Sequence, residues 1–252
     1  MFSSFLKYFL CAVAPLLWIH QSLAAEVSVA VAANFAAPMK IIAQNFERET
    51  GHKAVLSFGA TGQFYAQIKN AAPFAVLLAA DTHTPAKIEK AGLGVAGTKF
   101  TYAIGQLMLW SKKPGLVDDQ GEILKIGNFS KMAIANPKLA PYGSAAIEVL
   151  NHLGIMSQVK PKIVEGSNIA QAYQFVFSEN ASLGFVALSQ VFEDGKLKQG
   201  SGWIVPAKMH SPIKQDAILL NSGRNNPAAI ALMIYLQSEA AKAVIRKFGY
   251  EL

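Results

Sequence analysis

Cysteine and charged residues are scarce in this sequence. The 252 residues include a single cysteine, Cys11, and only 15% of them are Asp, Glu, Lys or Arg. Cys11 lies near the N-terminus, in a segment that we expect to be removed. The mature chain would then have no disulfide, no thiol nucleophile and no thiolate metal ligand. Such a chain suits an oxidising compartment outside the cytoplasm.

The sequence also lacks the common motifs of catalysis and of nucleic-acid binding. It contains no H-E-x-x-H motif, no G-x-S-x-G elbow and no P-loop, and no two histidines stand four residues apart. The net charge of +7 comes from scattered lysines and arginines, without a basic run that is interleaved with aromatics. We therefore expect no enzyme, no zinc site and no nucleic-acid partner, and we interpret the positive charge as a surface that attracts anions.

One short apolar run opens the chain. Lys7 precedes the apolar residues 8–19, and Ser22-Leu23-Ala24 fits the small-x-small pattern of an export signal. The run is too short to span a membrane, and no later stretch approaches the required length. We predict a cleaved signal peptide over residues 1–24, with cleavage after Ala25 as the alternative.

Buried strands alternate with helices along the rest of the chain. The first strand lies in residues 27–39, VSVAVAANFAAPM, where a β-branched run leads into a helix with Asn34 at its N-cap. Further strands are expected at 53–58, 75–80, 100–110, 132–135, 162–165, 183–188, 203–206 and 216–220, and helices at 37–50, 145–153, 169–177, 227–237 and 239–248. This alternation predicts an α/β fold of two lobes, each with a mixed, mostly parallel sheet flanked by helices.

The chain is expected to cross between the lobes twice. The extended run 100–110, FTYAIGQLMLW, leaves the first lobe, and the strand 216–220 returns to it. We expect residues 25–103 to form the first part of lobe 1, residues 104–213 to form lobe 2, and residues 214–252 to complete lobe 1. The hinge is expected near residues 102–105 and 212–215.

Four turns join a buried strand to a helix and consist of small or polar residues. They contain Ala33 and Asn34, Ala60, Thr61 and Gly62, Tyr142, and Asn168 and Ile169. Each turn alone is compatible with ordinary N-capping. However, ligands of α/β proteins bind at the carboxyl ends of strands, and helix N-termini favour anions. Because the turns contain no lysine or arginine, we expect them to hold a fully ionised oxyanion through neutral donors.

Several segments resemble a known family. AANFAAPM, SFGATGQFYAQI, FTYAIGQLMLWS, APYG and LGFVALSQV look like segments of the periplasmic molybdate-binding proteins of ABC importers, and the likeness covers about residues 25–252. The resemblance implies a type II periplasmic-binding-protein fold that closes about a hinge on molybdate or tungstate and delivers it to a membrane permease. It also implies a periplasmic location, no cofactor besides the ligand, and a monomer.

The resemblance assigns oxyanion contacts in lobe 1. Asn34 stands where the family binds through a side chain after the first strand, and Ala33 lies beside it. Thr61 stands in the place of the family's second hydroxyl, between Ala60 and Gly62. These residues offer hydroxyl, amide and main-chain N–H donors without a positive charge.

The resemblance assigns two further contacts in lobe 2. Tyr142 falls at a turn where some members offer a main-chain N–H and others a tyrosine, and Ile169 falls where the N–H that opens a helix is used. The chain departs from the family at Ala187, where some members bind with a tyrosine. We expect the phenol of Tyr142 to replace that tyrosine.

Two alternatives stay open at this point. A receptor for sulfate or phosphate would use the same turns, but protonated phosphate usually requires a carboxylate acceptor, and the nearest one is Asp81. Sulfate differs from molybdate in size, which the sequence does not specify. A periplasmic enzyme with a catalytic group assembled from separate segments is the alternative from another class, because a fold alone does not determine function.

Overall fold

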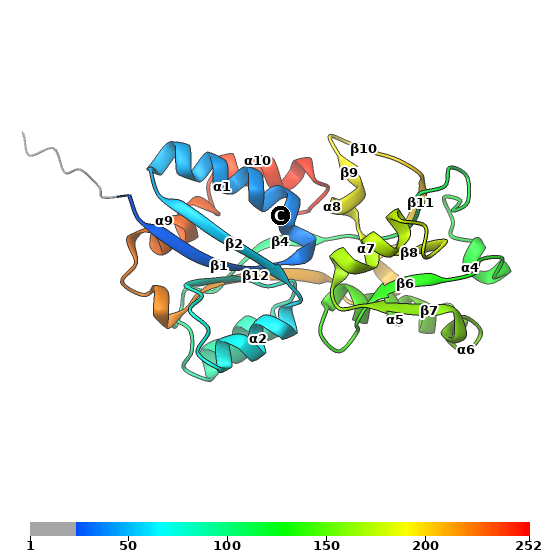
Figure 1. Ribbon diagram of the computed structural model, residues 1–252, viewed down its shortest axis with the longest axis horizontal. Coiled ribbons are helices and arrows are strands. Elements are labelled where there is room, and N and C mark those ends of the chain that lie inside the picture. Colours follow the sequence, from blue (N-terminus) through cyan, green and yellow to red (C-terminus); the bar gives the residue numbers. More distant parts are fainter. Residues whose placement is uncertain (1–23) are drawn as a thin grey trace, which may run out of the picture.

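The structure, a computed structural model, describes residues 24–252, so the predicted signal peptide lies almost wholly outside the described residues. Two five-stranded sheets lie side by side along the long axis of the molecule, with helices packed around each (Figure 1). Among residues 24–252, no single helix is long and apolar enough to cross a membrane. One pair of consecutive helices, α9 (Pro227–Tyr235) and α10 (Glu239–Lys247), is together long and apolar enough, by length and composition only, but the two are bent by 61° relative to each other.

The first sheet and its helices form lobe 1. The strand order is β2-β1-β3-β12-β4, with β1 (Glu26–Ala32), β2 (Lys53–Gly59), β3 (Val76–Leu78), β4 (Phe100–Gly105) and β12 (Ile213–Leu219). β1 pairs in parallel with β2 and β3, whereas β12 runs antiparallel to β3 and β4. Helices α1 (Ala36–Thr50), α9 and α10 pack on one face, and α2 (Thr61–Lys69) and α3 (His83–Lys90) pack on the other.

The second sheet repeats this arrangement and forms lobe 2. Its order is β11-β5-β8-β6-β7, with β5 (Leu107–Ser111), β6 (Met132–Ala135), β7 (Ile163–Gly166), β8 (Leu183–Ala187) and β11 (Ser201–Ile204). Its helices are α4 (Ile123–Ile126), α5 (Pro141–His152), α6 (Met156–Val159), α7 (Ile169–Phe177) and α8 (Leu188–Val191), and β9 (Phe192–Glu193) and β10 (Lys196–Leu197) form a small hairpin. β5 is antiparallel to both of its neighbours. In each lobe, therefore, the antiparallel strand is the one through which the chain arrives from the other lobe.

The central strands are buried on both faces. Val27, Val29 and Val31 of β1 pack with α1, α9 and α10, while Ala30 packs with α2 and α3. β3 and β12 alternate in the same way. Since helices cover both faces, these strands appear in the sequence as continuous apolar runs, which is why the sequence pattern located them.

Most predicted elements are confirmed to within a few residues, and three predictions were wrong in detail. The run 100–110 is two strands of different sheets, broken at Gln106. Helix α5 begins at Pro141 and not at 145, because proline fits the first helical turn, where no N–H is needed. The last strand of lobe 1 begins at Ile213, before the predicted start at 216. The elements α4, α6, α8, β9 and β10 are too short to show a period and were not predicted.

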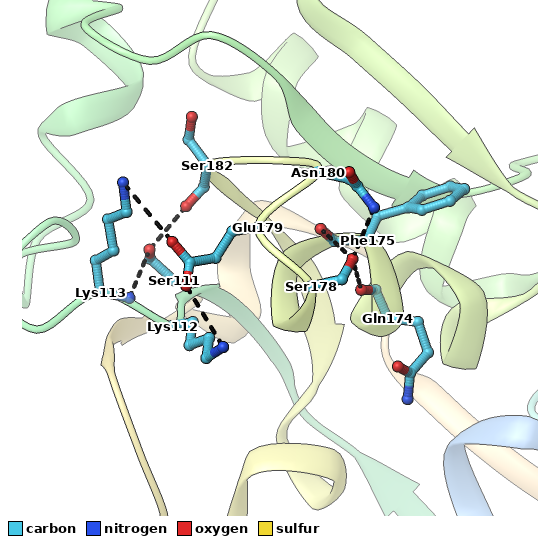
Figure 2. A network of polar contacts seen from close by, with 9 residues as sticks. All are labelled: Ser111, Lys112, Lys113, Gln174, Phe175, Ser178, Glu179, Asn180 and Ser182. Carbon is cyan, nitrogen blue, oxygen red and sulfur yellow. Dashed lines mark hydrogen bonds and ion pairs between the residues drawn. The ribbon is translucent and has the colours of Figure 1, made fainter.

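The C-terminal end of α7 is fastened to the end of β5 (Figure 2). Ser111 Oγ donates to the main-chain oxygen of Ser182 at 2.7 Å, and Glu179 forms ion pairs with Lys112 and Lys113. The ion pairs are largely exposed and contribute little by themselves, so the serine contact is the firmer link. These contacts fasten the loop between α7 and β8 to the end of β5, and α7 itself begins at the interface between the lobes.

Gly105 ends β4 at the first crossing between the lobes. A Cβ atom at this position would lie 2.0 Å from Tyr142 Oη and 2.6 Å from Gln215 Nε2. Tyr142 belongs to α5 of lobe 2, whereas Gln215 belongs to β12 of lobe 1. The missing side chain thus allows a tyrosine of one lobe to approach the crossing strands of the other.

We predict that Gly105→Ala pushes the lobes apart. The added methyl group overpacks the interface, which should lower the free energy of unfolding by about 1–3 kcal/mol and enlarge the radius of gyration. Thermal unfolding and small-angle scattering measure the two effects. The neighbouring variant Gln106→Ala is the control, because its amide contacts only the exposed Glu251 carboxylate, and it should stay within about 0.5 kcal/mol. Unchanged stability and dimensions of Gly105→Ala would mean that close packing at this glycine does not hold the lobes together.

Candidate functional site

A small cavity lies between the two lobes, at the carboxyl ends of four parallel strands. Its volume is about 10 Å³, comparable with the space that one water molecule requires. It is lined by Ala32, Ala33, Asn34, Gly59, Ala60, Thr61, Ala80, Ala140, Pro141, Tyr142, Asn168 and Ile169. None of these lining residues carries a charge. The structure therefore brings together residues that follow β1, β2, β3, β6 and β7, which lie far apart in the sequence.

Six of the seven residues that the sequence predicted for the site line this cavity. They are Ala33, Asn34, Ala60, Thr61, Tyr142 and Ile169. The seventh, Gly62, lines a neighbouring cavity of about 480 Å³. The N–H of Gly62 donates to the main-chain oxygen of Leu139 at 2.9 Å, a contact between lobe 1 and the segment that leads to α5. Gly62 thus joins the lobes beside the small cavity.

Helix N-termini surround the small cavity. Thr61 opens α2, Tyr142 is the second residue of α5, and Ile169 opens α7. A 3-10 turn, Ala33–Phe35, leads into α1. The first N–H groups of a helix have no acceptor within the helix, and each N-terminus is equivalent to about half a positive charge. Three helix N-termini and the 3-10 turn before α1 therefore place partial positive charge around the cavity, which favours an anion.

The hydroxyl of Thr61 is held ready to donate. Thr61 is 1% exposed, and its Oγ1 accepts the N–H of Ala80 at 3.0 Å. Ala80 stands two residues after the end of β3 and also lines the cavity. Since the hydroxyl oxygen already accepts a hydrogen bond, its own proton is left for an acceptor in the cavity.

The predicted N-cap role of Asn34 is wrong. Asn34 lies within the 3-10 turn, and its side chain caps no N–H group. Instead, Nδ2 donates to Gln215 Oε1 at 2.8 Å and to Tyr250 Oη at 3.0 Å. The main-chain oxygen of Asn34 accepts from Tyr250 Oη and from Ser189 Oγ. The side chain is therefore fixed by tertiary contacts, and it is only 2% exposed.

The phenol of Tyr142 reaches the same polar group. Its Oη accepts from Gln215 Nε2 at 3.2 Å, and Gln215 Oε1 lies 3.0 Å from Tyr102 Oη. Burial raises the pKa of Tyr102 and of Tyr142 well above the usual value, and it raises the pKa of Tyr250 to about 12. All three phenols are therefore protonated at neutral pH and can act as hydrogen-bond donors. The replacement of a family tyrosine by this phenol stays a prediction.

Gln215, Tyr250 and Ser189 were not predicted from the sequence. Gln215 stands just before the predicted strand 216–220, near the expected hinge. A polar residue at the start of an apolar strand was the one signal in the sequence that could have marked it as a site residue. Tyr250 and Ser189 carry no local signal, because they meet Asn34 only through the fold.

Charged residues gather in the neighbouring larger cavity. Asp81, the carboxylate nearest to the turns, lies there beside Lys87 and Lys138 and does not line the small cavity. Burial raises the pKa of Asp81, although hydrogen bonds from the N–H and hydroxyl of Thr84 oppose this shift. Among residues 24–252, no group of three His, Cys, Asp or Glu is arranged to hold a metal ion.

Comparisons with known proteins agree with this geometry. Residues 27–251 match the family model described as bacterial extracellular solute-binding protein. The molybdate-binding protein ModA of Azotobacter vinelandii is 61% identical over 91% of both chains. ModA of Rhodobacter capsulatus is 49% identical over 90% of this chain and 88% of its own length.

A solved structure extends the likeness to three dimensions. The periplasmic molybdate-binding protein of Azotobacter vinelandii has a TM-score of 0.87 to this structure at 41% identity, and the match covers 90% of this chain and 99% of that one. The α/β fold with two lobes that the sequence predicted is thereby confirmed. The chain belongs to the bacterial extracellular solute-binding proteins, the family that also contains the molybdate-binding protein ModA.

Proposed function

We propose that this chain is the molybdate-binding component of an ABC importer and binds molybdate or tungstate between its two lobes. The observation that carries the proposal is the small cavity lined only by uncharged residues at four strand-to-helix turns, in a chain that is 61% identical to a molybdate-binding protein. The chain acts by binding and release and is not an enzyme. Closure of the lobes is favoured by the ligand because donors from both lobes reach it only when they are closed.

Hydroxyl, amide and main-chain groups share the proposed contacts. In lobe 1, Thr61 donates through its hydroxyl, and Asn34 donates through its side chain or its N–H. In lobe 2, Tyr142 and Ile169 contribute from the first turns of α5 and α7. For Tyr142 the donor is the main-chain N–H or the phenol.

Small residues allow the main chain to approach the ligand. Ala33 and Ala60 line the cavity without filling it. Gly62 acts through close packing, because a Cβ atom there would lie 3.1 Å from the Cα atom of Leu139. We propose that this glycine permits lobe 1 to close against lobe 2 beside the ligand.

The choice among oxyanions follows from protonation and size. Protonated phosphate carries a donor, and the lining of the cavity offers no carboxylate to accept it. Sulfate is fully ionised like molybdate and differs from it in size, so a sulfate receptor remains the second candidate. The fixed positions of the four turns make the size of the anion the property that separates the two.

We further propose that the lobes consist of residues 25–103 with 214–252 and of residues 104–213, with the hinge near 102–105 and 212–215. The crossing from β4 to β5 and the crossing from β11 to β12 support this division. The partner would be the membrane permease of the importer, which receives the anion when the lobes open. The protein would act as a monomer.

The proposed location is the periplasm, after removal of residues 1–24. The intact mass of the protein recovered from the periplasm should correspond to a chain that begins at Ala25, or at Glu26 for the alternative cleavage site. Recovery of the full-length chain would contradict the proposed processing and leave the binding site untouched.

Thermal unfolding with a panel of anions tests the proposed ligand. At a hundred times the dissociation constant, a ligand adds about 2.7 kcal/mol to the free energy of unfolding, which raises Tm by several degrees for a protein of this size. We expect this increase with molybdate and tungstate, and none with sulfate or phosphate at the same concentrations. An increase with sulfate, or no increase with any of the four anions, would refute the molybdate assignment.

Substitution of Thr61 tests the proposed donor. Thr61→Val preserves the shape of the side chain but removes the hydroxyl, so the charge-assisted hydrogen bond to the anion and the acceptor of the Ala80 N–H are both lost. We expect molybdate affinity, measured by calorimetry, to fall about 10- to 100-fold. Thr61→Ser is the matched control, because it keeps the hydroxyl and should bind within about threefold of the parent. Equal affinities of the Val and Ser variants would remove Thr61 from the site.

A further inference from the structure

A buried polar network lies beside the cavity and crosses the interface between the lobes. Its members are Asn34, Tyr102, Gln215 and Tyr250 of lobe 1 and Tyr142 and Ser189 of lobe 2. Gln215 is fully buried in β12 and lies at the centre. Its side-chain amide is 2.8 Å from that of Asn34 and 3.2 Å from the phenol of Tyr142. One glutamine thus joins candidate ligand-binding residues of both lobes.

The side-chain amide of Asn34 presents its oxygen to the cavity. Both hydrogens of Nδ2 are used, one by Gln215 Oε1 and one by Tyr250 Oη. Oδ1 has no hydrogen-bond partner among residues 24–252. Every fully buried side-chain oxygen and nitrogen in that range has a partner, so Oδ1 is not fully buried. Oδ1 is therefore open to the cavity that Asn34 lines. An acceptor in this position repels an oxyanion.

A second arrangement of the same atoms presents the nitrogen. Exchanging nitrogen and oxygen in both amides leaves every heavy-atom distance unchanged. Gln215 Nε2 then donates to Asn34 Oδ1 and to Tyr102 Oη, and Tyr142 donates to Gln215 Oε1. Tyr102 gives its proton to the main-chain oxygen of Ala79, which is 3.0 Å away. Asn34 Nδ2 faces the cavity with both hydrogens free for an anion.

The two amides must reverse together. If Asn34 alone reversed, its Oδ1 would lie 2.8 Å from Gln215 Oε1 with no proton between the two oxygens. Such a contact is unfavourable in a buried site. The orientation of Gln215 therefore determines which end of the Asn34 amide faces the ligand.

Within the protein, the two arrangements are closely balanced. In the first, the single proton of Tyr102 has two acceptors at 3.0 Å, Ala79 O and Gln215 Oε1. In the reversed one, the single proton of Tyr250 has two acceptors on Asn34, at 3.0 Å and 2.9 Å. Ser189 Oγ adds contacts to Tyr250 Oη and to the main-chain oxygen of Asn34, so each arrangement leaves two oxygen–oxygen contacts without a proton. An anion in the cavity therefore decides between them.

We propose that Gln215 is a positioning residue that reverses together with Asn34, so that Asn34 Nδ2 donates to the bound oxyanion. The inference rests on the proposed function, since it assumes an oxyanion in the small cavity. Because Tyr142 belongs to lobe 2, Gln215 holds the reversed orientation fully only when the lobes are closed. The oxyanion thus selects a donor whose orientation is fixed from the opposite lobe.

Gln215→Glu tests the proposal through its pH dependence. An ionised carboxylate has the shape of the amide but only accepts, so it holds Asn34 Nδ2 and leaves Oδ1 toward the cavity. A protonated carboxyl has one O–H that can donate to Asn34 Oδ1. Burial raises the pKa of a carboxyl introduced here. Molybdate affinity of Gln215→Glu should be about 10- to 100-fold below the parent near pH 8 and should recover toward pH 6.

The parent protein should show a flat profile over the same range. The titratable groups of the network are phenols, and burial raises the pKa of Tyr250 to about 12 and the pKa of Tyr102 and of Tyr142 well above the usual value. Charged groups close to Gln215 include its neighbours in β12, Lys214 and Asp216, the latter paired with Lys99 at 3.2 Å. Asp81, whose main-chain oxygen accepts the N–H of Asp216, and Glu251, which bridges to Ile104 of β4, lie on adjoining segments. A parallel measurement of the parent corrects for any titration of these groups.

A double variant separates positioning from charge repulsion. Repulsion between an ionised glutamate and the anion would also weaken binding near pH 8. In an Asn34→Ala background there is no amide to orient, so the recovery on lowering the pH should shrink to less than about threefold. Recovery of full size in that background would overturn the proposal, and so would parent-like affinity of Gln215→Glu near pH 8.

Gln215→Leu provides a second measurement should the glutamate variant fold poorly. Gln215→Leu should bind molybdate about 10- to 100-fold more weakly than the parent. Added to Asn34→Ala, the same substitution should change the affinity of that variant by less than about threefold. Equal losses in both backgrounds would overturn the positioning role. Failure of the parent protein to bind molybdate in this assay would instead refute the proposed function, so the two failures are distinguishable.

Discussion

Burial of a doubly charged anion removes its hydration, and dipoles fixed in the protein must replace the lost water. In the proposed site the replacement would come from the first turns of α2, α5 and α7 and from the 3-10 turn before α1, which the two sheets hold in place. Alanine and glycine at the turns keep side chains out of the way, so that main-chain N–H groups define the cavity. The apolar strands and their helices serve this arrangement, because any shift of a strand end moves a donor away from the anion.

The topology connects the two lobes through the strands that meet the site. β5 and β12 are the antiparallel strands of their sheets, and each follows a crossing from the other lobe. Gln215 lies on β12, and Gly105 lies at the end of β4, close to the phenol of Tyr142. The mechanical link between the lobes and the polar contacts beside the cavity are therefore built from the same short segments. A change in the angle between the lobes must alter the hydrogen bonds of Asn34.

Local patterns in the sequence were sufficient for the strands, most helices and the four turns. Strands covered on both faces appear as apolar runs, and helix starts carry recognisable residues such as Asn168, whose side chain caps α7 as predicted. The environment of Asn34 was not accessible in this way. An asparagine before a helix resembles an N-cap, yet its partners Gln215 and Tyr250 stand 181 and 216 residues away in the sequence. Contacts across such separations form only because the chain returns to lobe 1 after lobe 2, and no local pattern specifies that return.

A neutral network also explains how one set of residues can serve two states. A buried lysine would attract the anion strongly, but without the anion it would remain an uncompensated charge, which costs several kcal/mol. An amide carries a donor and an acceptor at equivalent positions, so it can reverse and keep its hydrogen bonds within the protein. Phenols adapt in the same way, since each can rotate its single proton between two acceptors. The site therefore combines a strong response to a dianion with a small penalty for releasing it, and a carrier that must give up its ligand requires both.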